Sequence, residues 1–67
     1  MRYDWTFHCF KGGNYWECAV TDENGDQQRN RSETSFETRG DAILDAKRNG
    51  LDANAEAHVV VFKRYTS

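Results

Sequence analysis

The chain has 67 residues and a formal net charge of -2 at pH 7, with 9 basic against 11 acidic side chains. A chain this short forms one domain, residues 1–67, and folding buries only about 60% of the surface of its unfolded state, which leaves a thin core. The acidic balance gives no long-range attraction to phosphate and so disfavours a nucleic-acid partner. No apolar run reaches the length of a signal peptide or a membrane span, so we expect a cytoplasmic protein with no membrane partner.

Two strands joined by a tight turn open the chain. Residues 3–10 alternate between apolar and polar side chains, which is the period of a half-buried strand. Lys11-Gly12-Gly13-Asn14 tolerates the positive φ angles of a hairpin turn, and residues 15–22 carry an apolar row on their even positions. We expect a helix to cover the face of this hairpin that is formed by Trp5, Phe7, Cys9, Trp16, Cys18 and Val20.

The turn leaves two registers open. If Gly13-Asn14 is the two-residue loop, Cys9 lies opposite Cys18, whereas a Gly12-Gly13 loop places Cys9 opposite Trp16. A disulfide between the cysteines is sterically conceivable in the first register. Because the cytosol is reducing, we expect two buried thiols instead.

Asn24-Gly25 is the strongest short hairpin signal in the chain, and a third strand is expected from about Asp26. The residues that follow contain nothing apolar, and simple pairing across the turn directs Arg29 and Arg31 toward the helix side. Two arrangements resolve this conflict. Either the third strand is an edge strand whose arginine stems lie over Trp16, or it contains a β-bulge.

The segment of about residues 39–49 is predicted to be an amphipathic helix, because it has both a start and a stop signal. Thr38 is the expected N-cap, and Asp41 places negative charge in the first turn. Gly50 fits the left-handed position after the last turn, and Leu51 is the apolar residue that folds back onto the helix. The face toward the sheet contains Ala42, Ile43 and Ala46, with Leu44 and Leu51 on its shoulder.

Residues 58–65 are predicted to form the last strand, and Val59 to Phe62 make it apolar on both faces. The fold is therefore α+β, an antiparallel β-β-β hairpin sheet with one helix packed on one face and a fourth C-terminal strand. A right-handed crossover would place strand four parallel to strand one, in the sheet order 3-2-1-4. A domain this thin cannot cover both faces of strand four, so we expect a second copy to cover one of them.

Large aromatic side chains are expected to supply most of the buried area, since each buried ring removes roughly 150 to 250 Å² from water. The six assigned to the core are Trp5, Phe7, Trp16, Phe36, Phe62 and Tyr65.

The stretch from Trp16 to Gly50 resembles the YegP-like family of small β-β-β-α domains. The resemblance lies in an aromatic on the second strand, an Asn-Gly turn, a serine, an aromatic before the helix, and spaced alanines leading to a glycine, which here are Trp16, Asn24-Gly25, Ser32, Phe36, Thr38, Ala42, Ala46 and Gly50. The chain departs from the family pattern in its polar third strand and its added fourth strand. Some members carry two such units packed about a pseudo-twofold axis, so the resemblance implies a homodimer for a single-unit chain. It implies no biochemical activity, because the family has none settled.

A second likeness is to the β-β-β-α-β core of HicB-type antitoxins. It is carried by Gly40-Asp41 at the helix start, followed by spaced alanines. That family binds a toxin and in many cases binds DNA through an extra C-terminal domain, for which we expect no room in this chain.

No group of residues suggests catalysis, a cofactor or a metal. His8, Cys9, Cys18 and His58 are the soft metal ligands, but strand alternation sends His8 and Cys9 to opposite faces and no zinc-type spacing occurs. Asp41 and Asp45 lie one helical turn apart and are interpreted as a cap and a solvated charge. We therefore expect a protein that is not an enzyme.

The leading functional hypothesis is a small noncatalytic interaction module that acts as a homodimer and contacts a protein partner. The alternative is single-stranded nucleic-acid binding, with aromatic residues interleaved among polar ones on the exposed sheet face. A basic cluster of Arg29, Arg31, Lys63 and Arg64 could take a phosphate backbone or an acidic protein, but we interpret it as charge that protects edge strands against aggregation. The candidate interaction surface comprises His8, Phe10, Tyr15, Arg29, Arg31, Val60, Phe62 and Arg64.

Overall fold

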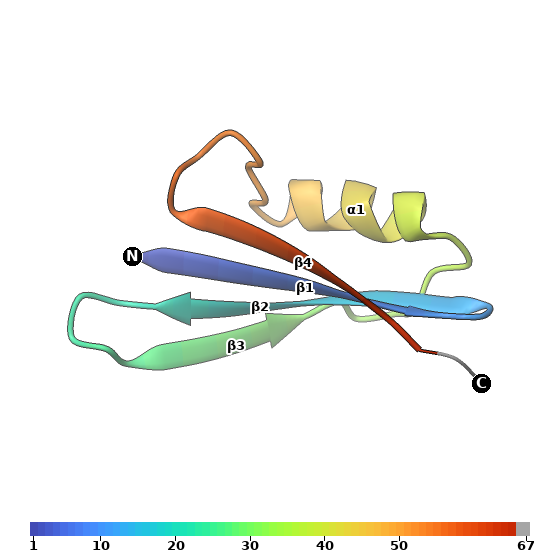
Figure 1. The fold of residues 1–67 in the computed structure, drawn as a ribbon, viewed down its shortest axis with the longest axis horizontal. Helices are drawn as coiled ribbons and strands as arrows, with labels where there is room; N and C mark the ends of the chain where they lie inside the picture. Colours follow the sequence, from blue (N-terminus) through green and yellow to red (C-terminus); the bar gives the residue numbers. More distant parts are fainter. Residues whose placement is uncertain (66–67) are drawn as a thin grey trace.

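The computed structural model describes residues 1–65 and confirms the expected α+β fold with the order β-β-β-α-β. Four strands form one sheet, and a single helix lies across one of its faces (Figure 1). The helix has 10 residues, and nothing helical within residues 1–65 is long and apolar enough to cross a membrane. The elements are β1 (Arg2–Phe10), β2 (Gly13–Thr21), β3 (Gln27–Arg31), α1 (Arg39–Arg48) and β4 (His58–Arg64).

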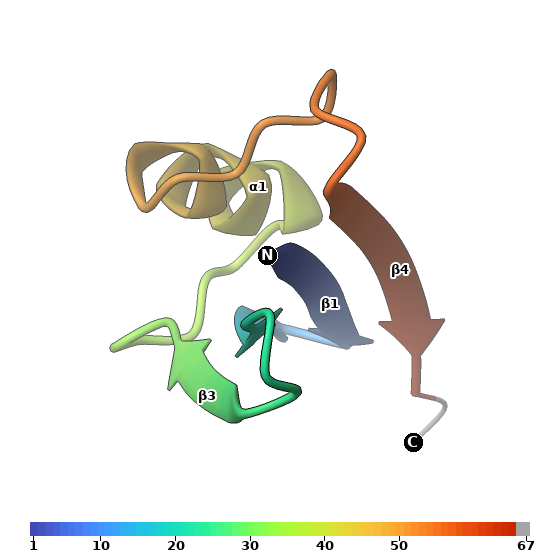
Figure 2. The ribbon, with the colours of Figure 1, turned by 90° about the vertical axis from the view of Figure 1, so that its left-hand side faces the viewer.

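The strands are ordered β3-β2-β1-β4, as the crossover argument predicts. β1 pairs antiparallel with β2, and β2 pairs antiparallel with β3, whereas β4 runs parallel to β1. The sheet is therefore mixed, because the chain passes over one face through α1 before it returns beside β1. β3 and β4 are the two edges, on opposite sides of the central pair (Figure 2).

Both registers expected for the first hairpin are wrong. Phe10 pairs with Gly13, so the loop is Lys11-Gly12, and Gly12 adopts the left-handed conformation at φ 79°. Asn14 is needed in β2, where its backbone N–H and C=O bond Phe36 at 2.8 and 2.7 Å and its Nδ2 donates to the Phe36 carbonyl. This anchor, which holds the segment before α1, accounts for a loop that ends one residue earlier than the glycine pair suggests.

The expected position of the β3 arginines is also wrong. The loop spans residues 22–26, because the Asp22 carboxylate accepts hydrogen bonds from the Asn24 and Asp26 amides at 2.9 Å each. Thr21 then pairs with Gln27, and β3 turns Gln28 and Asn30 toward the helix side. The arginines face the opposite way, so no arginine stem has to cover Trp16 and no bulge is required.

The predicted helix signals are confirmed. Thr38 is the N-cap, and its Oγ1 accepts a hydrogen bond from the Asp41 amide at 3.1 Å. At the other end Gly50 has φ 110°, and the Leu51 amide donates to the Ala46 carbonyl at 3.0 Å. These bonds use backbone groups that a helix terminus otherwise leaves unpaired.

The core lies between α1 and the two central strands. Its buried members are Trp5, Phe7, Trp16, Cys18, Ala42, Ala46 and Leu51. Phe36 is half-buried against this core, but the prediction that Phe62 and Tyr65 are core residues is wrong, since they are 46% and 40% exposed. Phe62 lies on the edge strand β4 and Tyr65 follows it, whereas the buried positions of the sheet are on β1 and β2.

Candidate functional site

The eight residues proposed as one interaction surface lie on two different faces of the sheet. We call the side opposite α1 the helix-free face. The strand registers place His8, Phe10, Tyr15, Arg29 and Arg31 on it. They place Val60, Phe62 and Arg64 on the helix side, opposite Trp5, Phe7 and Cys9 respectively. The structure thus brings five of the eight together and separates the other three.

The helix-free face carries a cluster of stacked rings at one end, which we call the aromatic cluster: His8, Phe10, Tyr15 and Tyr65. The Phe10 and Tyr65 rings are 4.2 Å apart at an interplanar angle of 8°. The His8 and Tyr15 rings are 4.6 Å apart at 16°. Tyr65 joins the cluster because its amide donates to the Cys9 carbonyl, which extends the β4 pairing past Arg64. The exposed fractions of the Phe10 and Tyr65 side chains leave both in contact with solvent.

His8 is the buried centre of the aromatic cluster. Its Nδ1 lies 2.7 Å from the Tyr65 hydroxyl, and its Nε2 lies 2.5 Å from Glu17 Oε1. The second contact lacks the geometry of a hydrogen bond. The two ring nitrogens thus lie against neighbours after β4 and on β2, which makes His8 a structural link across the face.

The helix-free face has the opposite charge balance to the whole chain. By register it carries four basic side chains, Arg2, Arg29, Arg31 and Lys63, and two acidic ones, Asp4 and Glu17. Asp4 is paired with Arg2 at 3.1 Å, and Glu17 is paired with His8. These are the ion pairs found within residues 1–65, so three cations on this face have no carboxylate partner there. The guanidinium of Arg31 instead lies over the Tyr15 ring, 5.3 Å from its centroid.

A shallow hollow of about 250 Å³ lies between two of these cations. Arg29 from β3 and Lys63 from β4 stand on either side of it, with Thr6 and Ala19 from the central strands between them. Asp4 and Glu17 also line it, where Asp4 is paired with Arg2 and Glu17 lies against the His8 ring.

The edge strand β4 exposes apolar groups on both faces of the sheet. Val59 and Val61 lie on the helix-free face, and Val61 is 45% exposed. Phe62 lies on the helix side, where it stacks on Phe7 at 5.2 Å and has the Arg39 guanidinium 5.0 Å from its centroid. Only part of each side chain is covered.

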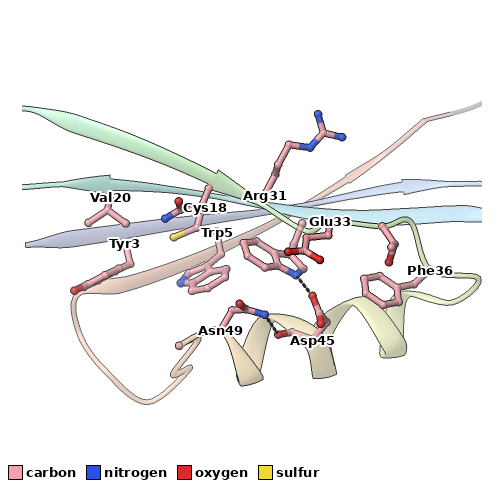
Figure 3. A pocket seen from close by; sticks show the side chains of 13 residues that line it. Tyr3, Trp5, Cys18, Val20, Arg31, Glu33, Phe36, Asp45 and Asn49 are labelled. Atoms are coloured by element: carbon pink, nitrogen blue, oxygen red, sulfur yellow. Dashed lines mark hydrogen bonds between the residues drawn. The ribbon is translucent and has the colours of Figure 1, made fainter.

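A groove of about 570 Å³ separates α1 from β3 on the helix side (Figure 3). Trp16 lies along it and donates from its indole Nε1 to Asp45 Oδ2 at 2.8 Å. Asp45 was interpreted from sequence as a solvated charge, and this bond was missed because the sequence predicts which face the helix covers but not which helical residue lies beside Trp16. Figure 3 also shows the Arg31 side chain directed away from the groove.

The two cysteines do not face each other. Cys9 pairs with Asn14 and Cys18 pairs with Trp5, and both are free thiols. Burial raises the pKa of the Cys18 thiol above its ordinary value of 9.0, and the negative charge of Asp4 adds to this effect. A raised pKa suppresses the thiolate, which is the nucleophilic form, so Cys18 has the character of a buried core residue.

No three histidine, cysteine or acidic side chains converge as a metal site in the part of the chain that the structure describes. His58 has a different role, because its Nδ1 accepts hydrogen bonds from the Trp5 indole at 3.1 Å and from the Asp52 amide at 3.3 Å. It therefore ties the start of β4 to the core.

Comparison of this chain with protein-family models, with curated proteins and with solved structures finds no match.

Proposed function

We propose that this protein is a noncatalytic interaction module that works as a homodimer, joined through the free edge of β4. The observation that carries the proposal is a sheet edge that is unpaired within residues 1–65 and whose side chains are apolar on both faces. Val59, Val61 and Phe62 are all more than a third exposed on this strand. An exposed apolar edge of this kind is a template for pairing with another strand.

The direction of the backbone groups supports pairing. The Tyr3 amide donates to the Ala57 carbonyl and the Tyr65 amide donates to the Cys9 carbonyl, so the odd-numbered residues of this segment bond β1. Because bonding groups alternate along a strand, the N–H and C=O groups of Val60 and Phe62 point outward from the sheet.

One register uses the whole strand. Antiparallel pairing of two copies centred on Val61 places Val60 opposite the second copy's Phe62, and both of these residues have outward backbone groups. It sets Val61 against its own copy and includes all seven residues of β4. Such an interface is the same patch on both subunits, which closes as a twofold dimer rather than growing as a fibre.

Sedimentation velocity at micromolar concentration tests this proposal. The wild-type chain should sediment as a dimer of the 7.8 kDa subunit. Val61→Lys should sediment as a monomer, because two lysines would face each other at the centre of the interface. Val61→Thr keeps a β-branched side chain without charge and should remain dimeric.

A wild-type monomer at these concentrations would refute the proposal. So would a Val61→Lys variant that stays dimeric with unchanged circular dichroism.

A further inference from the structure

The helix-free face concentrates positive charge on a chain that is acidic as a whole. Four of the nine basic side chains lie on it, against two of the eleven acidic ones, of which Asp4 is paired with Arg2 and Glu17 lies against the His8 ring. Arg29, Arg31 and Lys63 are left to face solvent across the width of the sheet. Net charge disfavours a polyanion at long range, but this distribution attracts one at short range.

Solvent-exposed rings lie beside these cations. Phe10 is 42% exposed, and its ring stacks on that of Tyr65. Tyr15 stands next to Phe10 at 6.1 Å, and Arg31 covers its other side. A planar group can extend this row of parallel rings by stacking on its outer members.

The combination of cations and stacked rings defines the ligand. Phosphates account for the cations, and nucleobases account for the rings, because stacking on aromatic side chains is available to any base that is not already in a duplex. Duplex nucleic acid is a poor fit, since its bases are stacked on each other and closed to a flat sheet. An acidic peptide would satisfy the cations but leave the aromatic cluster without a role.

We infer that the helix-free face binds single-stranded nucleic acid. Arg29, Arg31 and Lys63 contact the phosphates, and the backbone crosses the hollow between Arg29 and Lys63. Phe10 and Tyr65 stack on a base at the end of the face. The inference does not depend on the β4 dimer, because every residue it uses lies on one face of one subunit.

Fluorescence anisotropy with labelled dT12 and U12 tests the inference. Three phosphate contacts predict a slope of log K against log salt of about -2, so raising salt from about 50 to 200 mM should weaken binding about 20-fold. Lys63→Gln and Arg29→Gln should each reduce the slope by about 0.7. Lys47→Gln makes the same change on exposed helix α1 and should leave both affinity and slope unchanged.

A separate variant tests whether the aromatic cluster stacks on a base. Phe10→Leu keeps the apolar volume but removes the ring, so it should weaken binding at least about fivefold without altering the salt slope. A fall in affinity with an unchanged slope separates stacking from charge.

Three results would overturn the inference. Absence of oligonucleotide binding at about 50 mM salt is the first. The second is binding that survives the charge variants, and the third is equal competition by polyglutamate together with no effect of Phe10→Leu, which would identify an acidic-peptide site. Val61→Lys adds a cation to the same face, so as a monomer it should bind the oligonucleotides at least as tightly as the wild type, and failure of the dimer and failure of this site are distinguishable.

Discussion

The two edge strands of the sheet differ in the chemistry of their exposed side chains. Every residue of β3 is exposed, and its sequence QQRNR contains only polar side chains. β4 exposes valine and phenylalanine along a strand of seven residues. Polar and charged side chains are the usual protection of an edge strand, whereas an apolar edge calls for a partner. β3 is therefore protected against pairing with another strand, whereas β4 is not.

β1 holds the apolar edge strand β4 in place. Phe7 is buried between Trp16 on β2 and Phe62 on β4, and Phe7→Ala should cost about 3 to 5 kcal/mol. A chain of this size has roughly 3 to 10 kcal/mol of total stability, so this variant should lose about a third of it or more and associate more weakly. Urea denaturation followed by tryptophan fluorescence measures the loss. A change below about 1 kcal/mol would mean that Phe7 is not the packing centre.

Replacing the β3 arginines with valine should make β3 as prone as β4 to pair with another strand. Arg29→Val with Arg31→Val makes both edges apolar, so dimers should associate further instead of stopping. Light scattering should then show a mass that keeps rising with concentration. Lys47→Val adds an apolar group away from both edges and serves as the control. If the β3 variant has the same mass as the wild type at all concentrations, charge is not what closes that edge.

The helix cap should affect stability without changing either edge. Thr38→Ala removes the acceptor of the Asp41 amide and should cost about 1 kcal/mol, lowering the melting temperature by about 4–8 °C. Thr38→Ser retains the hydroxyl and should melt close to wild type. Both variants should remain dimeric, and a change of sedimentation in either would link the cap to the interface.

The smallest effect concerns the groove beside β3. The pKa of Cys18 is raised in the folded state, so above pH 9 the unfolded chain ionises first and the free energy of unfolding falls as pH rises toward the folded pKa. The slope is at most about 1.4 kcal/mol per pH unit, and below the unfolded pKa this stability is fully present. Cys18→Ala should flatten the dependence between pH 8 and 10. An identical slope in the variant would mean that water reaches the thiol.

The sequence predicts best those parts of the fold that depend on local signals. The ends of the helix are defined by hydrogen bonds within a few residues, at Thr38, Gly50 and Leu51. The 3-2-1-4 strand order follows from the handedness of a single crossover. The register of the first hairpin was predicted wrongly. The face toward the helix was still predicted correctly, because both expected registers differ from the observed one by an even number of residues.

Features that depend on side-chain bonds within a loop, or on distant contacts, could not be predicted from the sequence. The β3 register depends on Asp22, whose side chain lengthens the loop, and the burial of Phe62 depends on where α1 lies above the sheet. The candidate surface lies on two faces because the sequence does not show which alternating pair of β4, Val60 with Phe62 or Val59 with Val61, faces the helix. Tyr65 was assigned to the core, and its place beside Phe10 required the pairing of β4 with β1.

Amide hydrogen exchange at single-residue resolution tests the difference between the edges most directly. Val60 and Phe62 on β4, and Arg29 and Arg31 on β3, have outward N–H groups by the alternation of the ladders. Pairing through β4 predicts that the Val60 and Phe62 amides become protected as protein concentration rises, while the two arginine amides exchange rapidly throughout. Equally rapid exchange of all four amides in concentrated protein would contradict the account.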